Sequence, residues 1–312
     1  MANIREIQDR IKSINDTKKI TNAMYLISSS KLKRAKKSLS DTEPYFFALQ
    51  SSIAKILEHT DSTQVRQKYF EEGMTKPEAE RKKAYIVVTA DKGLAGAYNH
   101  NVIKIAEKEI EKHPNSKIYI IGQVGMHYFE HRNVEFSHSF KYTIQNPTLS
   151  RARSIAETLL DSYLRDKVDE VYIIYTKMIN SMSSEAEMLK LLPMDKGDFK
   201  TDELLETGER TEYEFMPSSD VVFDTIVPNW LSGLVYGALV EAYCSEQNSR
   251  MMAMQSSTDN ANEMLRDLNV VYNRVRQAAI TQEITEVISG AKAQKSKTVS
   301  YTHLTLPTKL EV

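Results

Sequence analysis

The sequence is poor in cysteine and has no long apolar run. Cys244 is the single cysteine among 312 residues, which excludes an internal disulfide and a thiolate zinc cluster within one chain. The longest apolar runs, such as residues 85–88 and 172–175, are far shorter than the roughly 20 residues that a bilayer-spanning helix needs. The first residues include acidic side chains and no apolar signal region. We therefore expect no direct insertion into a bilayer, although the chain could dock onto a membrane complex.

A net charge of either sign is also nearly absent. The 41 basic and 42 acidic residues leave a formal charge of −1, which argues against a surface built throughout for nucleic acid. The charge is unevenly spread, because residues 1–40 hold ten basic and three acidic residues. Such a segment forms a solvated helix face, or it meets an acidic partner or nucleic acid, and the lack of interleaved aromatic residues weakens single-strand binding. Its densest part is a run of five cations, Lys31, Lys33, Arg34, Lys36 and Lys37.

Glycine and proline are missing from much of both ends of the chain. Residues 1–43 contain neither. The spacing of the apolar residues in this segment shifts after Thr17, and Pro44 could kink a helix. We predict an N-terminal helix over residues 1–58, because its first apolar positions step by three and four residues as in a heptad seam: Ile4, Ile7, Ile11 and Ile14.

The C-terminal part shows a similar pattern. Residues 238–289 again lack glycine and proline, and one face carries heptad-spaced apolar positions: Leu265, Leu268, Tyr272, Val275 and Ala279. Nearer the middle of the chain the same heptad-spaced positions hold small and polar residues, such as Ser245. We predict a helix over residues 215–295 that pairs antiparallel with the N-terminal helix as a long coiled coil, with Ile20 close to Thr281. The alternative is two separate amphipathic helices packed on a central domain.

Between these segments the pattern changes to alternating strands and helices. Short apolar runs rich in β-branched and aromatic residues predict strands at 85–89, 117–121 and 170–175. Helical patterns separate them at 101–113, 124–131 and 148–165, the last with Asn146 as N-cap and Pro147 at the first helical position. The fold class is therefore α/β: a central, Rossmann-like domain with partly parallel pairing, plus the coiled coil of the terminal helices.

The remaining boundaries follow from composition. Residues 59–83 read as a charged linker, the central domain covers 84–194, and residues 195–214 form an acidic loop. In residues 296–312 the helical pattern is lost, and Pro307 would break a helix. We expect this tail to be disordered or foreign to the functional fold.

One short pattern imitates a metal site. His127, Glu130 and His131 match the His-x-x-Glu-His arrangement of inverted zinc peptidases, in which two histidines one helical turn apart share a metal. No convincing third ligand accompanies them. A short helix with Tyr128 and Phe129 turned inward is the favoured interpretation, so we predict no metal site.

Two glycine-containing segments follow predicted strands. Gly122 and Gly125 lack the remainder of a dinucleotide-binding motif, and residues 91–96 lack the Gly-Lys-Ser/Thr end of a phosphate loop. We predict tight strand-to-helix turns at both places. The sequence therefore indicates no cofactor, and no nucleophile with a convincing base nearby.

Three further segments carry a family pattern in order along the chain. They are Thr17-Lys18-Lys19-Ile20-Thr21-Asn22-Ala23-Met24, then Thr89-Ala90-Asp91-Lys92-Gly93-Leu94-Ala95-Gly96, then Arg276-Gln277-Ala278 with Ile280-Thr281-Gln282-Glu283-Ile284. With their surroundings they resemble the γ subunits of bacterial F-type ATP synthases over residues 2–293. The sequence departs from that pattern at Ala95, at Ala97 and across 195–214, and a lone Cys244 excludes the dithiol switch of plant-type relatives.

The resemblance implies a function without catalysis. The terminal helices would be a rotating shaft inside a ring of three α and three β subunits, and the α/β domain would sit with the ε subunit, its foot on the membrane c-ring. Such a subunit is not itself an enzyme; it couples ion flow to ATP synthesis or hydrolysis as a peripheral protein at the cytoplasmic face of the cell membrane. No motif identifies the coupling ion or the prevailing direction.

The resemblance also assigns contact residues, position by position. Ring contacts would come from Met24, Arg250, Arg276, Gln277, Thr281 and Glu283. The cations Lys31, Lys33, Arg34, Lys36 and Lys37 would meet an acidic loop of the β subunit, and Tyr213, in segment 213–217, would belong to the foot. For each of them the alternative is an ordinary surface residue of the coiled coil. Two other functions remain open from the residues alone: a basic coiled-coil protein that binds nucleic acid, and a hydrolase whose metal is held by the His-x-x-Glu-His residues.

Overall fold

The computed structural model describes residues 4–59, 69–70, 76–77, 80–137, 140, 144–180, 183–199, 216 and 218–299. Their contacts divide the chain into two compact units, one made by residues up to Asn22 together with those from Ser256 onward, the other by residues from Ala23 to Gln255. Two long helices, α1 (Ile4–His59) and α5 (Ser219–Val299), contribute to both units. These helices confirm the predicted helical ends of the chain.

The second unit contains a four-stranded mixed sheet. Its strands are β1 (Lys83–Val88), β2 (Lys117–Ile121), β3 (Glu170–Met178) and β4 (Ser184–Leu192), in the order β2-β1-β3-β4. β1 runs parallel to both β2 and β3, and β4 pairs antiparallel with β3. The three predicted strands and their parallel pairing are confirmed, whereas β4 was not predicted.

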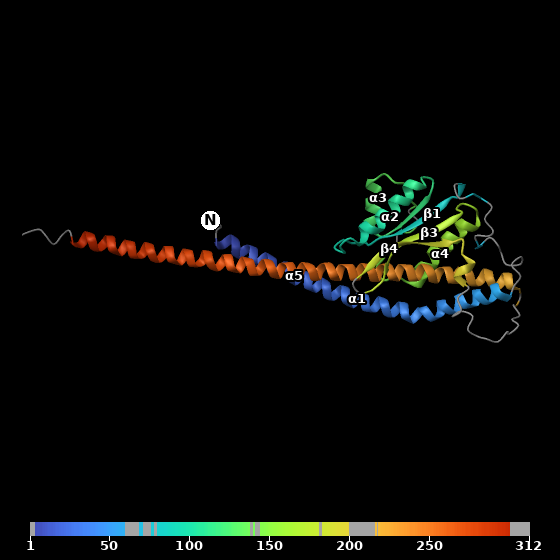
Figure 1. The fold of residues 1–312 in the computed structure, drawn as a ribbon, viewed down its shortest axis with the longest axis horizontal. Coiled ribbons are helices and arrows are strands. Elements are labelled where there is room, and N and C mark those ends of the chain that lie inside the picture. Colours follow the sequence, from blue (N-terminus) through green and yellow to red (C-terminus); the bar gives the residue numbers. More distant parts are fainter. Residues whose placement is uncertain are drawn as a thin grey trace, which may run out of the picture. The chain divides into compact units, whose positions relative to one another are not determined.

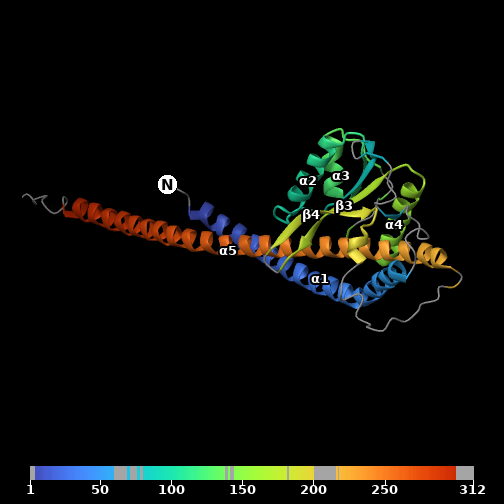
Figure 2. The ribbon, with the colours of Figure 1, turned by 45° about the vertical axis from the view of Figure 1, so that its right-hand side comes forward.

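Helices cover both faces of this sheet, as Figures 1 and 2 show. In β1 the side chains of Tyr85 and Val87 pack with α2 (Tyr98–Lys112) and α3 (Gln123–His131). Those of Ile86 and Val88 belong to the larger core, formed with α4 (Leu149–Leu164) and with parts of α1 and α5. Because both faces are covered, every residue of β1 is buried, which explains its continuous apolar sequence.

The start of α4 differs from the predicted start. Thr148 is the N-cap: its backbone is extended, with φ −121° and ψ 148°, and its hydroxyl accepts a hydrogen bond from the backbone N–H of Arg151 at 3.4 Å. An N-cap needs this extended conformation, whereas Asn146 has a positive φ of 54°. The prediction of Asn146 as N-cap and Pro147 as first helical residue was wrong by two positions.

Within the second unit, α1 and α5 pack against each other in opposite directions. The rings of Phe46 and Tyr236 lie 6.2 Å apart, and the backbone of Gly233 lies against the ring of Phe46 so closely that a β-carbon would overlap it. Both helices continue through an internal proline, Pro44 in α1 and Pro228 in α5.

The predicted acidic loop begins with a short 3₁₀ helix. Residues Lys196–Phe199 form this turn, and Phe199 is buried with its ring 5.2 Å from that of Trp230. The predicted tail, residues 296–312, begins too early, because α5 continues to Val299. Residues 200–215 and those from 300 onward lie outside the described residues. Across the part of the chain that is described, no helix combines the length and apolar character needed to cross a membrane.

Candidate partner-contact surfaces

In the first unit, the start of α1 pairs antiparallel with the end of α5. The side-chain amide of Gln8 donates a hydrogen bond to the Tyr272 hydroxyl at 3.0 Å, and the hydroxyls of Thr21 and Thr258 lie 2.8 Å apart. Moving forward in α1 therefore corresponds to moving backward in α5. This arrangement confirms the predicted antiparallel pair in this unit.

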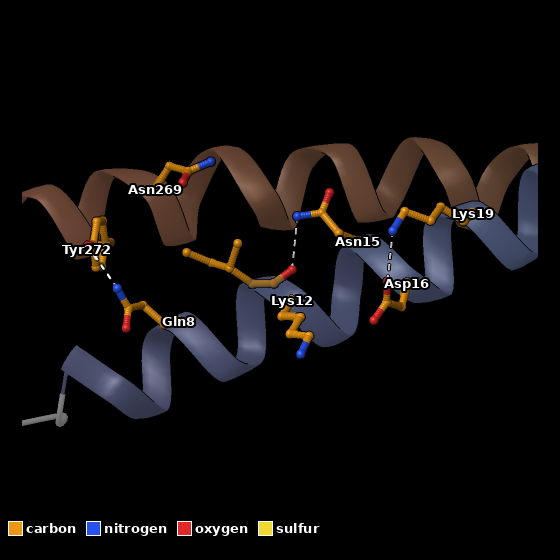
Figure 3. A pocket seen from close by; sticks show the side chains of 8 residues that line it. Gln8, Lys12, Asn15, Asp16, Lys19, Asn269 and Tyr272 are labelled. Carbon is orange, nitrogen blue, oxygen red and sulfur yellow. Dashed lines mark hydrogen bonds and ion pairs between the residues drawn. The ribbon is translucent and has the colours of Figure 1, made fainter.

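The seam of this pair is polar and partly open. A groove of 590 Å³ lies between the helices, and Figure 3 shows polar side chains around it. Several of them are already engaged within α1: Asn15 donates to the carbonyl of Ile11 at 3.1 Å, and Lys19 pairs with Asp16 at 3.0 Å. The lining residues are Gln8, Ile11, Lys12, Asn15, Asp16, Lys19, Asn269 and Tyr272.

The register of the pair differs from the predicted one. Since Gln8 lies opposite Tyr272, Ile4 lies opposite Arg276, and Ile20 lies opposite residues near 259. The prediction that Ile20 is close to Thr281 was therefore wrong by about 21 positions, or about 30 Å along a helix.

The end of α5, from Arg276 onward, carries four of the contact residues that the resemblance assigns. Arg276, Gln277, Thr281 and Glu283 are all exposed, and the Thr281 hydroxyl donates to the Gln277 carbonyl within the helix at 2.9 Å. An apolar stripe that sequence reasoning missed accompanies them, spaced i, i+4, i+7, i+8 on one helix face. Its members are between 48% and 72% exposed: Ile280, Ile284, Val287 and Ile288. An exposed apolar stripe of this kind is typical of a surface that another protein covers.

The five cations of α1 form an exposed belt in the second unit. Leu32 and Ala35, in the same two turns, face the core. No ion pair joins any of the five cations to another residue in the described parts of the chain. Lys33, Arg34, Lys36 and Lys37 are exposed and Lys31 is half-buried, so we call these five residues the basic belt.

Met24 lies in a second groove, of 250 Å³, within the second unit. α1 contributes Met24, Ile27 and Lys31, α5 contributes Arg250, and the β1–α2 turn contributes Leu94 among others. The groove is lined by both apolar and cationic side chains. Two of the apolar ones are largely exposed, Ile27 at 56% and Leu94 at 64%.

Arg250 differs from the other assigned contacts because it is nearly buried. It is 8% exposed, and its Nη2 nitrogen lies 2.7 Å from Glu246 Oε1 and donates to the backbone carbonyls of Lys92 and Gly93 at 3.2 and 3.1 Å. Burial raises the pKa of Glu246, and the charge of Arg250 opposes that rise. Sequence reasoning missed this internal role. The available signal was a run of polar residues within a long helix, all of them buried: Ser245, Glu246, Gln247 and Asn248.

The histidine pattern on α3 is a surface feature. His127, Glu130 and His131 are exposed, and His131 Nδ1 lies 2.7 Å from the backbone carbonyl of His127. The described residues contain no group of three or more histidine, cysteine or acidic side chains that could hold a metal ion.

The glycines after β2 form the predicted strand-to-helix turn. Gly122 has φ +100°, and a β-carbon there would overlap the backbone carbonyl of Thr89. Gly125 donates its N–H to the Thr89 hydroxyl at 3.0 Å. This close approach explains both glycines. Tyr213, the assigned foot residue, lies outside the described residues.

The sheet is mostly parallel and has helices on both faces, and the two long helices α1 and α5 run antiparallel. These features define the class of protein: an α/β domain combined with a pair of long helices. Residues 3–294 match the family model described as ATP synthase. The ATP synthase gamma chain of Ruminiclostridium cellulolyticum is 46% identical over 296 residues, 93% of this chain and 98% of that one. That of Acetivibrio thermocellus is 44% identical, covering 95% and 100%. The chain belongs to the ATP synthase gamma chain family.

The fold agrees with that assignment. A chain from the mitochondrial ATP synthase of Euglena gracilis, solved with its F1 part and c-ring, superimposes with a TM-score of 0.59 at 15% identity, covering 99% of this chain and 98% of that one. At such low identity the likeness shows the fold alone. Neither alternative considered from the sequence, nucleic-acid binding or metal-dependent hydrolysis, receives support from these comparisons.

Proposed function

We propose that this chain is the central-stalk rotor subunit of an F-type ATP synthase, coupling transmembrane ion flow to ATP synthesis or hydrolysis in a ring of three α and three β subunits. The observation that carries the proposal is similarity to ATP synthase gamma chains over nearly the full length of both chains. Matches confined to a single domain would support only a shared fold.

The helical pair has properties that a rotor needs. Helices stay stiff along their length, and in the first unit α1 and α5 support each other through contacts such as that of Gln8 with Tyr272. The exposed residues Arg276, Gln277, Thr281 and Glu283 would contact the inner wall of the ring. The apolar stripe near them would be covered by the same wall, which explains why it is not covered by its own chain.

The chain would contribute no catalytic residue. Its remaining partners would be an ε subunit and the membrane c-ring, and Tyr213 would belong to the foot that meets them. With these partners it would be held at the cytoplasmic face of the cell membrane as a peripheral subunit, without nucleic acid and without inserting into the bilayer.

Reconstitution tests the proposal. The chain is co-expressed with α, β and the remaining subunits of the complex, and ATPase activity and ion pumping into inverted vesicles are measured with and without it. We expect co-purification with α and β, and ATP-driven pumping only when the chain is present. Parallel arms with proton- and sodium-selective readouts identify the coupling ion. A chain that purifies away from α and β, or pumping that is unchanged without it, would overturn the proposal.

A further inference from the structure

The β1–α2 turn, residues 91–96, has little internal structure to fix its position. Leu94 and Gly96 have positive φ angles of 63° and 57°. The edges of the turn are attached: Ala90 N donates to Asn99 Oδ1 at 2.8 Å, and Ile144 N donates to Asp91 Oδ2 at 3.0 Å. The carbonyl groups in its middle, those of Lys92 and Gly93, receive no backbone hydrogen bond from the described residues.

Arg250 of α5 donates hydrogen bonds to both of these carbonyl groups. A single nitrogen, Nη2, donates to the Lys92 and Gly93 oxygens, 158 and 157 positions earlier in the chain. Glu246, one helical turn before Arg250, holds the same nitrogen at 2.7 Å, and its side chain is 4% exposed. Hydrogen bonds from a charged donor are stronger than neutral ones, so two of them from a buried arginine hold the middle of the turn against α5.

The β1–α2 turn presents two of its side chains to the surface. Lys92 is exposed and Leu94 is 64% exposed, and both line the groove that also contains Met24, Ile27 and Lys31 of α1. The cations of this surface favour an acidic segment, and its exposed apolar side chains favour apolar residues beside the acids. Arg250 offers little surface to such a segment, because it is only 8% exposed and its Nη2 nitrogen already lies against three acceptors of its own chain.

We infer that Arg250 is a positioning residue: it acts in coupling by holding the β1–α2 turn, so that Lys92 and Leu94 join the surface that meets an acidic segment of the surrounding ring, and it does not contact that ring itself. The inference rests on the proposed function. It changes the role that resemblance assigns to Arg250, and it adds two contact residues on a different element.

Single variants give the first test, in the complete complex. Arg250→Ala should lower the number of ions pumped per ATP hydrolysed, and Arg250→Lys should lower it less, because an ammonium retains the charge but not the geometry of the guanidinium. Arg266→Ala removes an exposed arginine from the same helix and should leave this ratio unchanged.

Since Arg250→Ala leaves Glu246 buried without its cation, the double variant Glu246→Gln/Arg250→Gln removes the hydrogen bonds to the turn while keeping the buried charge balanced.

A covalent replacement gives the decisive test. In a Cys244→Ala background, Lys92→Cys and Arg250→Cys are joined by a short bis-maleimide. A disulfide is unsuitable, because a whole arginine side chain separates the two backbones. Without cross-linker, the double variant should show the reduced coupling ratio of Arg250→Ala. If the arginine acts by holding the turn, the cross-link should restore the ratio to that of Lys92→Cys alone, although no arginine is present.

Each outcome decides. Restoration by the cross-link supports the positioning role, and so does loss of coupling in Leu94→Ala. Loss of coupling that persists after complete cross-linking means that Arg250 contacts the ring directly, and it overturns the inference. An unchanged ratio in Arg250→Ala overturns it as well. In every case the wild-type complex must assemble and pump; failure there would count against the proposed function and not against the role of Arg250.

Discussion

The side-chain amide of Gln8 donates a hydrogen bond to the hydroxyl of Tyr272, 264 positions later in the chain, at a distance of 3.0 Å. Together with the contact between Thr21 and Thr258, it fixes the register of the helical pair in the first unit. It follows that α5 extends past the first described residue of α1, so the assigned contacts Thr281 and Glu283 lie beyond the point opposite Ile4.

Distance measurements between spin labels test this register. In a Cys244→Ala background, labels at Ile20 and Asn260 should lie close together, whereas labels at Ile20 and Thr281 should be separated by about 30 Å, because 21 residues of helix rise about 1.5 Å each. Pulsed electron paramagnetic resonance gives both distances. Similar distances for the two pairs would contradict the register, and the singly labelled proteins control for contacts between molecules.

Two glycines one turn apart in α5 should respond oppositely to the same substitution. Gly237 has no heavy atom within 4 Å of an added β-carbon, so Gly237→Ala should stabilise the fold by about 1 kcal/mol through helix propensity. At Gly233 the β-carbon would overlap the ring of Phe46, so Gly233→Ala should destabilise the fold by about 1–3 kcal/mol through overpacking. Urea denaturation of the purified variants measures both changes, and equal signs would be inconsistent with the packing of α1 against α5.

Sequence patterns predicted the strands best where both faces are buried. β1, β2 and β3 are apolar over most of their length, and such runs are recognisable without knowledge of their neighbours. β4 is largely half-buried and carries Glu185, Glu187 and Lys190 among its apolar residues. Its pairing with β3 comes from the fold, and no continuous apolar run marks it.

The helices could also be predicted from the sequence, but not their register or the role of Arg250. A heptad pattern whose phase shifts near Thr17 is compatible with several registers, and the choice depends on polar contacts such as that of Gln8 with Tyr272. Nothing in the sequence around Arg250 indicates that its partners are carbonyl groups about 157 positions away. The basic belt, in contrast, is visible in sequence because local charge needs no tertiary contact.

Glu170 should make the stability of the fold depend on acid pH. It is 2% exposed at the start of β3. Burial raises its pKa, but hydrogen bonds from Arg81 and Tyr172 and the charges of Lys190 and Lys83 outweigh this, so its pKa lies below the usual 4.5. A lowered pKa in the folded state adds stability that is fully present above pH 4.5 and is lost as pH falls through the folded-state value.

Glu170→Gln should therefore destabilise the fold by about 3 kcal/mol near neutral pH, because it leaves the buried Lys83 and the half-buried Arg81 and Lys190 without their partner. The difference from wild type should shrink as the pH falls below 4.5. Thermal unfolding across this pH range measures it. Glu157→Gln, which changes an exposed carboxylate on α4, serves as the control and should differ little from wild type at any pH. A Glu170→Gln deficit that is the same at all pH values would refute the ionic role.

The basic belt should transmit force between the proposed rotor and the β subunits. Replacing Lys31, Lys33, Arg34, Lys36 and Lys37 together with alanine should leave α1 helical, since alanine has the highest helix propensity and no direct ion pair joins any of the five to another described residue. An exposed ion pair contributes only about 0.2–1 kcal/mol. No single cation fixes the angle of the rotor, but five in succession can bias it and still release.

The five-fold variant should assemble with α and β and hydrolyse ATP, but it should pump fewer ions per ATP. The wild-type ratio should itself fall as salt is raised, because contacts between exposed charges are screened with a Debye length of about 8 Å at physiological ionic strength. Lys104→Ala/Lys108→Ala removes two exposed cations from α2 and controls for the loss of positive charge at a site outside the belt. If the belt only keeps α1 solvated, the five-fold variant will pump as well as wild type at low salt, and the proposed contact with an acidic loop fails.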